Sequence, residues 1–161
     1  MIRVATASDA SAIADIYNHY ILNTLVSLEE KQIDALNIEG RMAEIEAIDL
    51  PYLIAETENG IVGYAYAGKW NGRCAYKHTS EVTIYLARQA IGQGIGTALY
   101  KQLFDELRQR NYHAVIAGIS LPNAGSVSLH EKFGMEKVAH FKEVGFKFGE
   151  WVDVGYWQGM L

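Results

Sequence analysis

The sequence is poor in cysteine, positive charge and long apolar runs, and each shortage excludes a class of protein. Its 161 residues include one cysteine, Cys74, so an internal disulfide and a cysteine-paired zinc site are both excluded. A single thiol is typical of a reducing compartment, so we expect a cytoplasmic protein. The formal net charge of −5 is unfavourable for general nucleic-acid binding.

The chain also lacks the segments that send a protein to a membrane or hold it there. No apolar stretch approaches the roughly 20 residues of a spanning helix. Residues 1–4 look like the start of a strand rather than a signal peptide. There is no repeat, low-complexity tract or flexible linker. We therefore predict a single domain over residues 1–161, with neither a membrane nor a nucleic acid as partner.

What the chain does contain is a glycine-rich turn between a strand and a helix. Gly92, Gly94 and Gly96 stand at every second position of the stretch from Glu81 to Tyr100. Glycines leave backbone N–H groups uncovered, and a helix start carries unpaired N–H donors with partial positive charge. The turn is therefore predicted to bind phosphate. A plain structural turn is the alternative, although three glycines in five residues would weaken one.

This turn differs from the two commonest phosphate-binding motifs. A dinucleotide fingerprint has the pattern G-x-G-x-x-G, and here Thr97 follows Gly96, with no third glycine at the required offset. A P-loop ends in G-K-[ST], and no lysine follows Gly96. A pyrophosphate site of a third kind remains.

Apolar periodicity and turn signals predict a mixed α/β domain. Ser8 is the expected N-cap of the first helix, Asn59-Gly60 the turn of a hairpin, and Gly134 the stop of the last helix. Strands are expected at 2–6, 52–58, 61–70, 81–86, 114–119, 135–141 and 151–157. The other helices are expected at 33–48, 94–110 and 123–133.

Two of these helices have a defined apolar face. The face of helix 33–48 is predicted to comprise Leu36, Met42, Ile45 and Ile48. The face of helix 94–110 is predicted to comprise Leu99, Tyr100, Leu103, Phe104 and Leu107.

The glycine turn resembles that of the GNAT N-acetyltransferases, whose pattern is Q/R-x-x-G-x-G/A. Within that family the chain looks most similar to the phosphinothricin and methionine sulfoximine acetyltransferase group. The most group-specific part is the tail, GFKFGEW at 145–151 and DVGYWQ at 153–158. Other matching segments are IYNHY (16–20), GYAYAGKW (63–70), Pro122-Asn123 with Ser126, and LHEKFG (129–134). The resemblance implies the GNAT fold, acetyl-CoA as donor and a small amino-acid-like amine as acceptor.

Two positions depart from the family pattern. Ile91 occupies the Q/R position, which removes a polar contact to the donor unless Gln89 or Gln93 replaces it. His130 stands where many GNAT enzymes have the tyrosine that protonates the leaving thiolate. His130 is therefore either the acid or a structural hydrogen-bonding residue. Arg88, just before the turn, either adds positive charge there or is an exposed surface residue.

The implied reaction needs a base. The α-amino group of an amino acid is largely protonated near neutral pH, so a proton must leave before or during attack on the thioester. Glu81 shares one face of its strand with Thr83 and Tyr85, and the resemblance makes it the predicted base. The strand alone would favour a solvated glutamate.

The resemblance also implies the contacts to the donor. The backbone of Ile84, Tyr85 and Leu86 is expected to meet the pantetheine arm and the thioester oxygen. Asn123 is expected at that arm as well as at a helix N-cap, and Lys132 either reaches the donor or is solvated. The residues expected at the pyrophosphate are Gly92, Gln93, Gly94, Ile95, Gly96 and Thr97.

The acceptor is expected at the loop KWNGRCAYKHT (69–79). Arg73 offers a two-pronged donor for a carboxylate or phosphinate, whereas an ordinary polar loop is the alternative. Leu28 is an expected apolar wall. An acyl-cysteine at Cys74 is disfavoured because direct transfer needs no nucleophile. The loop residues expected at the acceptor are Asn71, Gly72, Arg73 and Tyr76, with Lys77 as a further candidate.

Three functions stay open: a small-molecule N-acetyltransferase, a non-catalytic acetyl-CoA sensor, and a protein or peptide acetyltransferase. Glu81 separates the first from the second, because a sensor needs no base. We also predict a homodimer, because the C-terminal strands carry more large apolar surface than one edge should expose. A core contribution within one subunit is the alternative for these aromatic residues, which are Phe146, Phe148, Trp151, Tyr156 and Trp157.

Overall fold

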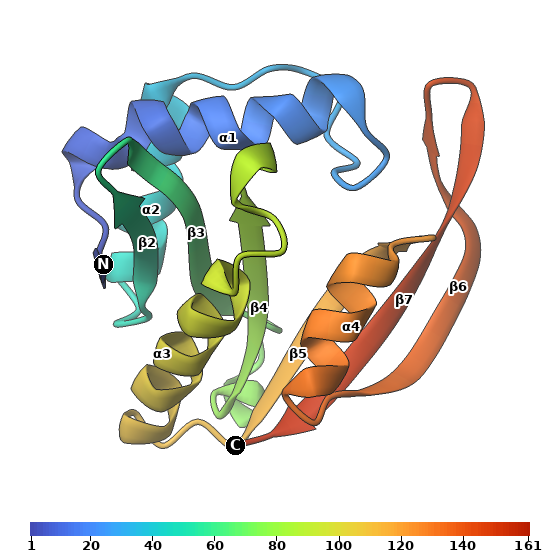
Figure 1. Cartoon of the computed structure of the whole chain (residues 1–161). Helices are drawn as coiled ribbons and strands as arrows, with labels where there is room; N and C mark the ends of the chain where they lie inside the picture. The colour runs from blue at the N-terminus through green and yellow to red at the C-terminus, as the bar shows by residue number, and fades with distance from the viewer.

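A seven-stranded sheet with helices on both faces forms the protein, described by a computed structural model over residues 1–161 (Figure 1). The strand order is β1-β2-β3-β4-β5-β7-β6, and only the β4–β5 pair is parallel. The strands are β1 (Ile2–Val4), β2 (Tyr52–Thr57), β3 (Gly60–Lys69), β4 (Thr79–Leu86), β5 (Ala114–Leu121), β6 (Glu136–Lys147) and β7 (Glu150–Met160). The helices are α1 (Ala10–Asn23), α2 (Ala35–Glu46), α3 (Ile95–Gln109) and α4 (Ala124–Lys132), with 3-10 turns at Ala7–Asp9, Cys74–Tyr76 and Arg88–Ala90.

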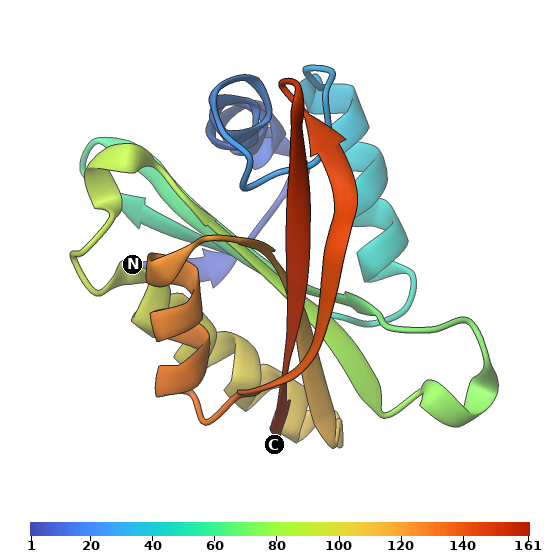
Figure 2. The same ribbon diagram turned by 90° about the vertical axis from the view of Figure 1, so that its right-hand side faces the viewer.

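The predicted mixed α/β fold is confirmed, and the helices form two layers. Helices α1 and α2 cover one face of the sheet, and α3 and α4 cover the other (Figure 2). The predicted apolar face of α3 is buried throughout, and Leu99, Leu103 and Leu107 are fully enclosed. Burying several large apolar side chains on one stripe fixes a helix on a sheet. None of the helices is long and apolar enough to cross a membrane.

The start of α1 differs from the prediction. Ser8 lies inside a 3-10 turn that Thr6 precedes, and α1 begins only after Asp9. The Asp9 carboxylate accepts a hydrogen bond from the Thr6 backbone N–H at 2.8 Å and is paired with Arg3 at 2.8 Å. Asp9, rather than Ser8, therefore organises this end, because a carboxylate satisfies helix-start donors and the arginine together.

For α2, two of the four residues predicted on the apolar face are wrong. Ile45 is buried and Met42 is partly buried, but Leu36 is 74% exposed and Ile48 is 44% exposed. The helix ends at Glu46, so Ile48 lies beyond it. Ile38 takes the inward position, because it lies seven residues, or two turns, before Ile45 on the same face.

The C-terminal hairpin is longer than the sequence predicted. Strand β6 continues to Lys147 and β7 starts at Glu150, with irregular register between Phe141 and Gly145. Phe148 and Gly149 close the hairpin with φ of 53° and 75°, the positive values that a tight two-residue turn requires. The hairpin stands well away from the rest of the sheet at its tip (Figure 1).

The centre of the sheet opens between β4 and β5. The two strands pair only from Thr79 to Glu81 on β4 and then diverge, as Figure 1 shows. On the other side, β4 stays paired with β3 along its length. Because backbone groups alternate in direction along an antiparallel pair, those of Val82 and Ile84 point into the opening. This opening positions the candidate site.

Candidate active site

The glycine turn ends as a helix start with free backbone donors. Gly92 and Gly94 have φ of +80° and +81°, and a Cβ at either position would project into open space. Gly94 caps α3 without a side chain, and the first turn of α3 holds no acidic residue. The N–H groups of Ile95, Gly96 and Thr97 therefore have no partner within the helix and suit an anion.

A groove of about 610 Å³ runs from this turn along α4 to the opening in the sheet; we call it the glycine groove. Lys132 on α4 reaches across it, and its ammonium donates to the Thr97 hydroxyl at 3.3 Å. Asn123 caps α4 by accepting the Ser126 N–H at 3.2 Å. The other predicted donor residues that line the groove are Ile84, Tyr85, Leu86, Gly92, Gly94, Gly96 and Thr97.

Three residues of the turn differ from the predicted acetyl-CoA contacts. Gln93 does not line the groove, because its side-chain amide donates to the Gln89 backbone carbonyl. The Ile95 side chain does not line it either, although its N–H belongs to the helix start. Ile91 does line the groove and is 60% exposed, so the position that lost a polar group offers an apolar contact instead.

Gly96 has a packing role that its neighbours lack. A Cβ at Gly96 would lie 3.3 Å from Leu129 Cδ2 and 3.4 Å from Leu86 Cδ1. This close approach brings the start of α3 against both β4 and α4. The absence of a side chain here therefore sets the position of the helix start relative to the opening.

The opening itself holds a second space of about 200 Å³, the inner cavity, between β4 and β5. The inner cavity adjoins the glycine groove, because Tyr85, Asn123 and Ser126 line both spaces. Tyr85 packs against Tyr17 and Tyr20 with ring centroids 4.9 and 5.1 Å away. The Tyr20 hydroxyl donates to the Leu86 carbonyl and so ties α1 to the free end of β4.

His130 lies at the wall of the inner cavity and is only 3% exposed. Its Nδ1 is 2.7 Å from the Ser126 carbonyl and its Nε2 is 2.8 Å from the Tyr100 hydroxyl. A carbonyl only accepts, so Nδ1 carries the proton and Nε2 accepts from Tyr100. Burial lowers the pKa of His130, which favours this neutral form. Tyr100, fully buried, was not predicted as part of the site.

A third space of about 500 Å³, the outer cavity, opens on the side of the β6–β7 hairpin. Its walls are mostly apolar, and the lining residues with polar side-chain groups are Glu81, Ser120 and Tyr156. Leu28, predicted as an apolar wall, does line it. The sequence did not predict the other wall residues, which are Gly118, Ser120, Phe141, Val144, Val154 and Tyr156. Of these, only Val154 and Tyr156 lie in a segment that matches the family.

Glu81 lines both the inner and the outer cavity. Its carboxylate is half-buried and makes no ion pair or hydrogen bond. Burial raises the pKa of this carboxyl, because a low-polarity site disfavours the charged form. An unpaired carboxylate with a raised pKa at a junction of cavities is the arrangement expected of a general base.

The predicted acceptor loop lies apart from these cavities. Asn71, Gly72, Arg73 and Tyr76 are exposed, and none lines the groove or either cavity. The loop projects from the sheet in Figure 2, and within it Asn71 Oδ1 accepts the Arg73 N–H at 3.1 Å. At its start, the ring of Trp70 lies 6.0 Å from that of Tyr156, which lines the outer cavity.

The architecture and the helix-start groove identify a class of protein. The Acetyltransferase (GNAT) domain family matches residues 2–155, and the chain belongs to this family. The L-methionine sulfoximine/L-methionine sulfone acetyltransferase of Salmonella typhimurium is 38% identical over 99% of this chain and 94% of its own length. The predicted membership of the GNAT N-acetyltransferases is thus confirmed.

Two solved structures match the fold over the whole chain. One is a GNAT superfamily phosphinothricin acetyltransferase from Sinorhizobium meliloti in complex with AcCoA, with 34% identity, a TM-score of 0.96 and 88% of that chain covered. The other is a ribosomal-protein-alanine N-acetyltransferase from Brucella melitensis, with 38% identity, a TM-score of 0.96 and 99% covered. The GNAT fold is therefore shared along its full length.

Proposed function

We propose that the protein transfers the acetyl group of acetyl-CoA to the amino group of a small amino-acid-like acceptor of the phosphinothricin or methionine sulfoximine type. One observation carries the proposal. Glu81 lines both the inner cavity, which is continuous with the glycine groove, and the outer cavity, which shares no lining residue with the groove. Donor and acceptor can therefore enter from different sides and meet at one unpaired carboxylate.

The glycine groove is the proposed site of the donor. The N–H groups from Gly92 to Thr97 bind the pyrophosphate, and Lys132 adds positive charge on the opposite wall. The pantetheine arm follows the groove past Asn123 into the opening. The backbone N–H of Ile84 points there and is placed to donate to the thioester oxygen as negative charge develops on it.

Transfer is proposed to be direct. Glu81 removes a proton from the acceptor ammonium, the amine nitrogen forms a bond to the thioester carbon, and the C–S bond then breaks. The leaving sulfur takes one proton, and Glu81 returns the other to solvent. The products are an N-acetylated acceptor, the free thiol of coenzyme A and one proton, so atoms and charge balance.

Two roles are proposed for His130: protonation of the leaving sulfur, which requires a proton on Nε2, or a structural role. His130 and Tyr100 lie on the wall of the inner cavity, into which the donor arm leads. The hydrogen bonds made by both ring nitrogens support the structural role.

The outer cavity is the proposed acceptor site. Its apolar walls suit the methylene groups of an amino-acid side chain, and Glu81 faces the amine. Asn71, Gly72, Arg73 and Tyr76 remain proposed contacts for the acceptor's carboxylate or phosphinate. Trp70, which touches Tyr156, places the base of their loop beside the cavity.

The decisive experiment is thiol release from acetyl-CoA by the purified protein. The panel contains phosphinothricin, methionine sulfoximine, methionine sulfone, an aminoglycoside and a basic peptide. Release with the three amino-acid analogues alone is the expected result. Release only with the peptide would move the assignment to protein acetylation, a function that one matching structure carries in its name. Acetyl-CoA binding without release to any acceptor would favour a sensor.

The protein is also proposed to be a homodimer. Three of the predicted residues, Phe146, Phe148 and Trp151, are each more than half exposed, as are Phe141 and Val144 on the same hairpin. Trp157, predicted with them, is only 2% exposed and belongs to the core of the subunit. An exposed row of this kind is more apolar than a monomer surface usually carries. Sedimentation at micromolar concentration should show a dimer, and Trp151→Glu should shift it toward monomer. A wild-type monomer would contradict the proposal.

The proposed setting is detoxification of amino-acid analogues in the cytoplasm, by a single domain over residues 1–161. The one cysteine, Cys74, is an exposed free thiol, which fits a reducing compartment. The continuous seven-stranded sheet supports the single domain. Cells that express the protein should tolerate methionine sulfoximine, whereas cells expressing Glu81→Gln should not.

A further inference from the structure

Lys147, near the tip of the β6–β7 hairpin, is a buried lysine that the proposed reaction does not use. Only 1% of the residue is exposed. Its ammonium donates to the backbone carbonyls of Thr24 at 2.8 Å and Ser27 at 2.6 Å, and lies 4.9 Å from the ring of Phe148. A buried ammonium is costly unless it is hydrogen-bonded, so these two contacts hold Lys147 firmly.

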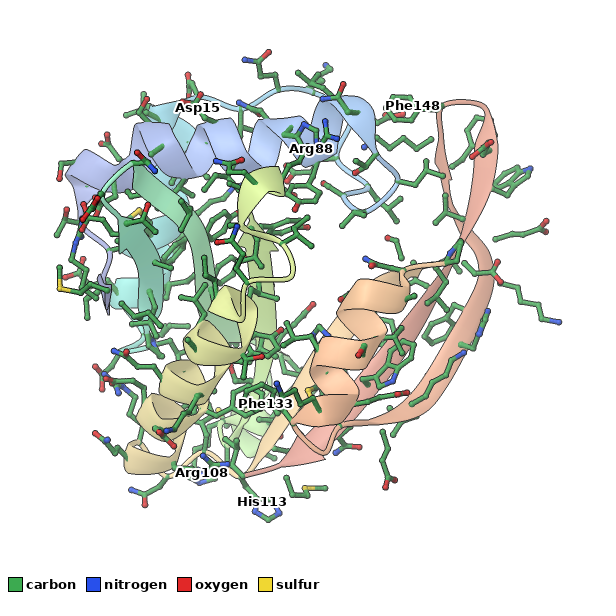
Figure 3. The ribbon with its side chains drawn as sticks, in the orientation of Figure 1. Asp15, Arg88, Arg108, His113, Phe133 and Phe148 are labelled. Carbon is green, nitrogen blue, oxygen red and sulfur yellow. The ribbon has the colours of Figure 1, made fainter.

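The two carbonyls belong to the segment that follows α1, residues 24–28. This segment has no regular secondary structure and bends through side-chain contacts of its own. Ser27 donates to the Tyr17 hydroxyl at 3.0 Å, and Thr24 donates to the Tyr20 carbonyl at 2.7 Å. The bonds from Lys147 are the hydrogen bonds that join this segment to the hairpin, across some 120 residues of sequence. Figure 3 labels Phe148, the next residue, at the hairpin tip near the end of α1.

The segment and the hairpin also touch next to the lysine. A Cβ built on Gly145 would lie 2.8 Å from Leu28 Cδ1, so the β6 backbone packs directly on the Leu28 side chain. Leu28 in turn lines the outer cavity together with Glu81 and Val144. The wall of the cavity is thus made of two chain segments that are held together by Lys147.

We propose that Lys147 is a positioning residue that fixes the Leu28 wall of the outer cavity and so sets which acceptor side chains fit. This inference rests on the proposed function, because it takes the outer cavity as the acceptor site. The ligand class is an amine with a short, largely apolar stem beyond the amine-bearing carbon. Lys147 itself touches neither substrate nor Glu81, and it acts through the segment 24–28.

The first test compares Lys147→Met with Lys31→Met. Lys31 is exposed in the same connection between α1 and α2 and makes no hydrogen bond. Its replacement therefore removes the same charge but leaves the two Lys147 hydrogen bonds intact. In Lys147→Met, the KM for methionine sulfone should rise about tenfold or more, since two charge-assisted hydrogen bonds are lost. The KM for acetyl-CoA should change less, because Val26 is the one residue of segment 24–28 that lines the glycine groove, and the glycine turn and Lys132 are unaltered. Lys31→Met should match the wild type in both.

A selectivity measurement adds a readout that a general loss of stability would not move. The wild type should discriminate between methionine sulfone and its S-ethyl homologue, which is longer by one methylene. Lys147→Met should bring the two kcat/KM values closer together, because a loosened wall admits both. Melting temperature and sedimentation should be recorded alongside, so that unfolding or loss of the dimer is detected.

A second perturbation reaches the same wall without altering any charge. Gly145→Ala should push Leu28 into the outer cavity and lower kcat/KM for the longer acceptor more than for the shorter one. Leu28→Ala in that background should restore the longer acceptor, whereas Leu28→Ala alone should favour it further. This pair decides the question if Lys147→Met fails to fold.

The outcomes separate this inference from the function on which it rests. A folded Lys147→Met with wild-type acceptor KM and selectivity would overturn it, as would a Gly145→Ala variant with unchanged selectivity. A wild-type protein that acetylates none of the amino-acid analogues would instead overturn the proposed function.

Discussion

The glycine groove and the outer cavity lie on either side of Glu81, and the chain builds them in different ways. Most of the groove comes from two short stretches, residues 84–97 and 123–132, each a strand or turn that leads into a helix, and Tyr20 and Val26 complete its lining. The outer cavity gathers Leu28, Glu81, Gly118 and Phe141 from segments spread over most of the chain. The donor side therefore depends mainly on local backbone geometry, whereas the acceptor side depends on how distant segments pack.

The largest effect should come from the residue that both sides share. Glu81→Gln keeps the shape of the side chain but cannot accept the amine's proton, so kcat should fall by about 10²–10⁴-fold. Calorimetry should show unchanged acetyl-CoA binding. Glu58→Gln, at an exposed turn, is the matched control. Unchanged turnover in Glu81→Gln would end its assignment as the base.

The same carboxylate should govern the acid side of the pH profile. Because burial raises the pKa of Glu81, the basic form is lost as pH falls through a value above the usual carboxyl range. In the wild type, kcat/KM should fall tenfold per pH unit below that value. Glu81→Gln should lack this limb. A limb that survives the substitution would point to another group.

A smaller effect, on the KM for acetyl-CoA but not on the KM for the acceptor, is expected at the glycine turn. Gly94→Val places a branched side chain at φ +81° and inside the groove, so the KM for acetyl-CoA should rise by about tenfold or more. The acceptor KM should change little, which would sharpen the contrast with Lys147→Met. Gly40→Ala, in the exposed interior of α2, should leave both KM values unchanged and raise stability by about 0.5–1 kcal/mol.

The smallest effect should appear in stability rather than in turnover. The pKa of His130 is lowered in the folded state, so below about pH 6.5 the unfolded chain binds a proton that the native protein does not. The free energy of unfolding should therefore decrease as the pH is lowered, by at most about 1.4 kcal/mol per pH unit. Urea midpoints at pH 7.5 and 5.5 should show a steeper fall for the wild type than for His130→Asn. His113→Asn, at the exposed site labelled in Figure 3, should behave like the wild type.

The contrast between the two sides also explains what the sequence could predict. The glycine turn, the buried face of α3 and the Asn123 cap follow from neighbouring residues, and all three are present. Phe141 and Val144 could not be recognised as cavity walls, because β6 was expected to end at Phe141 and its irregular register is not encoded by alternation. The predicted burial of Leu36 and Ile48 was wrong for a related reason, since the ends of α2 decide which residues face inward.

The divergence of β4 from β5 has a consequence for the protein before any donor arrives. From Val82 onward, one side of β4 is an unpaired strand edge in the middle of the sheet, the kind of edge onto which foreign strands can add. A donor bound along this edge would cover it and shield its amides from hydrogen exchange. Ligand that binds only the folded state also raises the free energy of unfolding in proportion to the logarithm of its concentration. The lifetime of this protein in the cell should therefore follow the supply of acetyl-CoA.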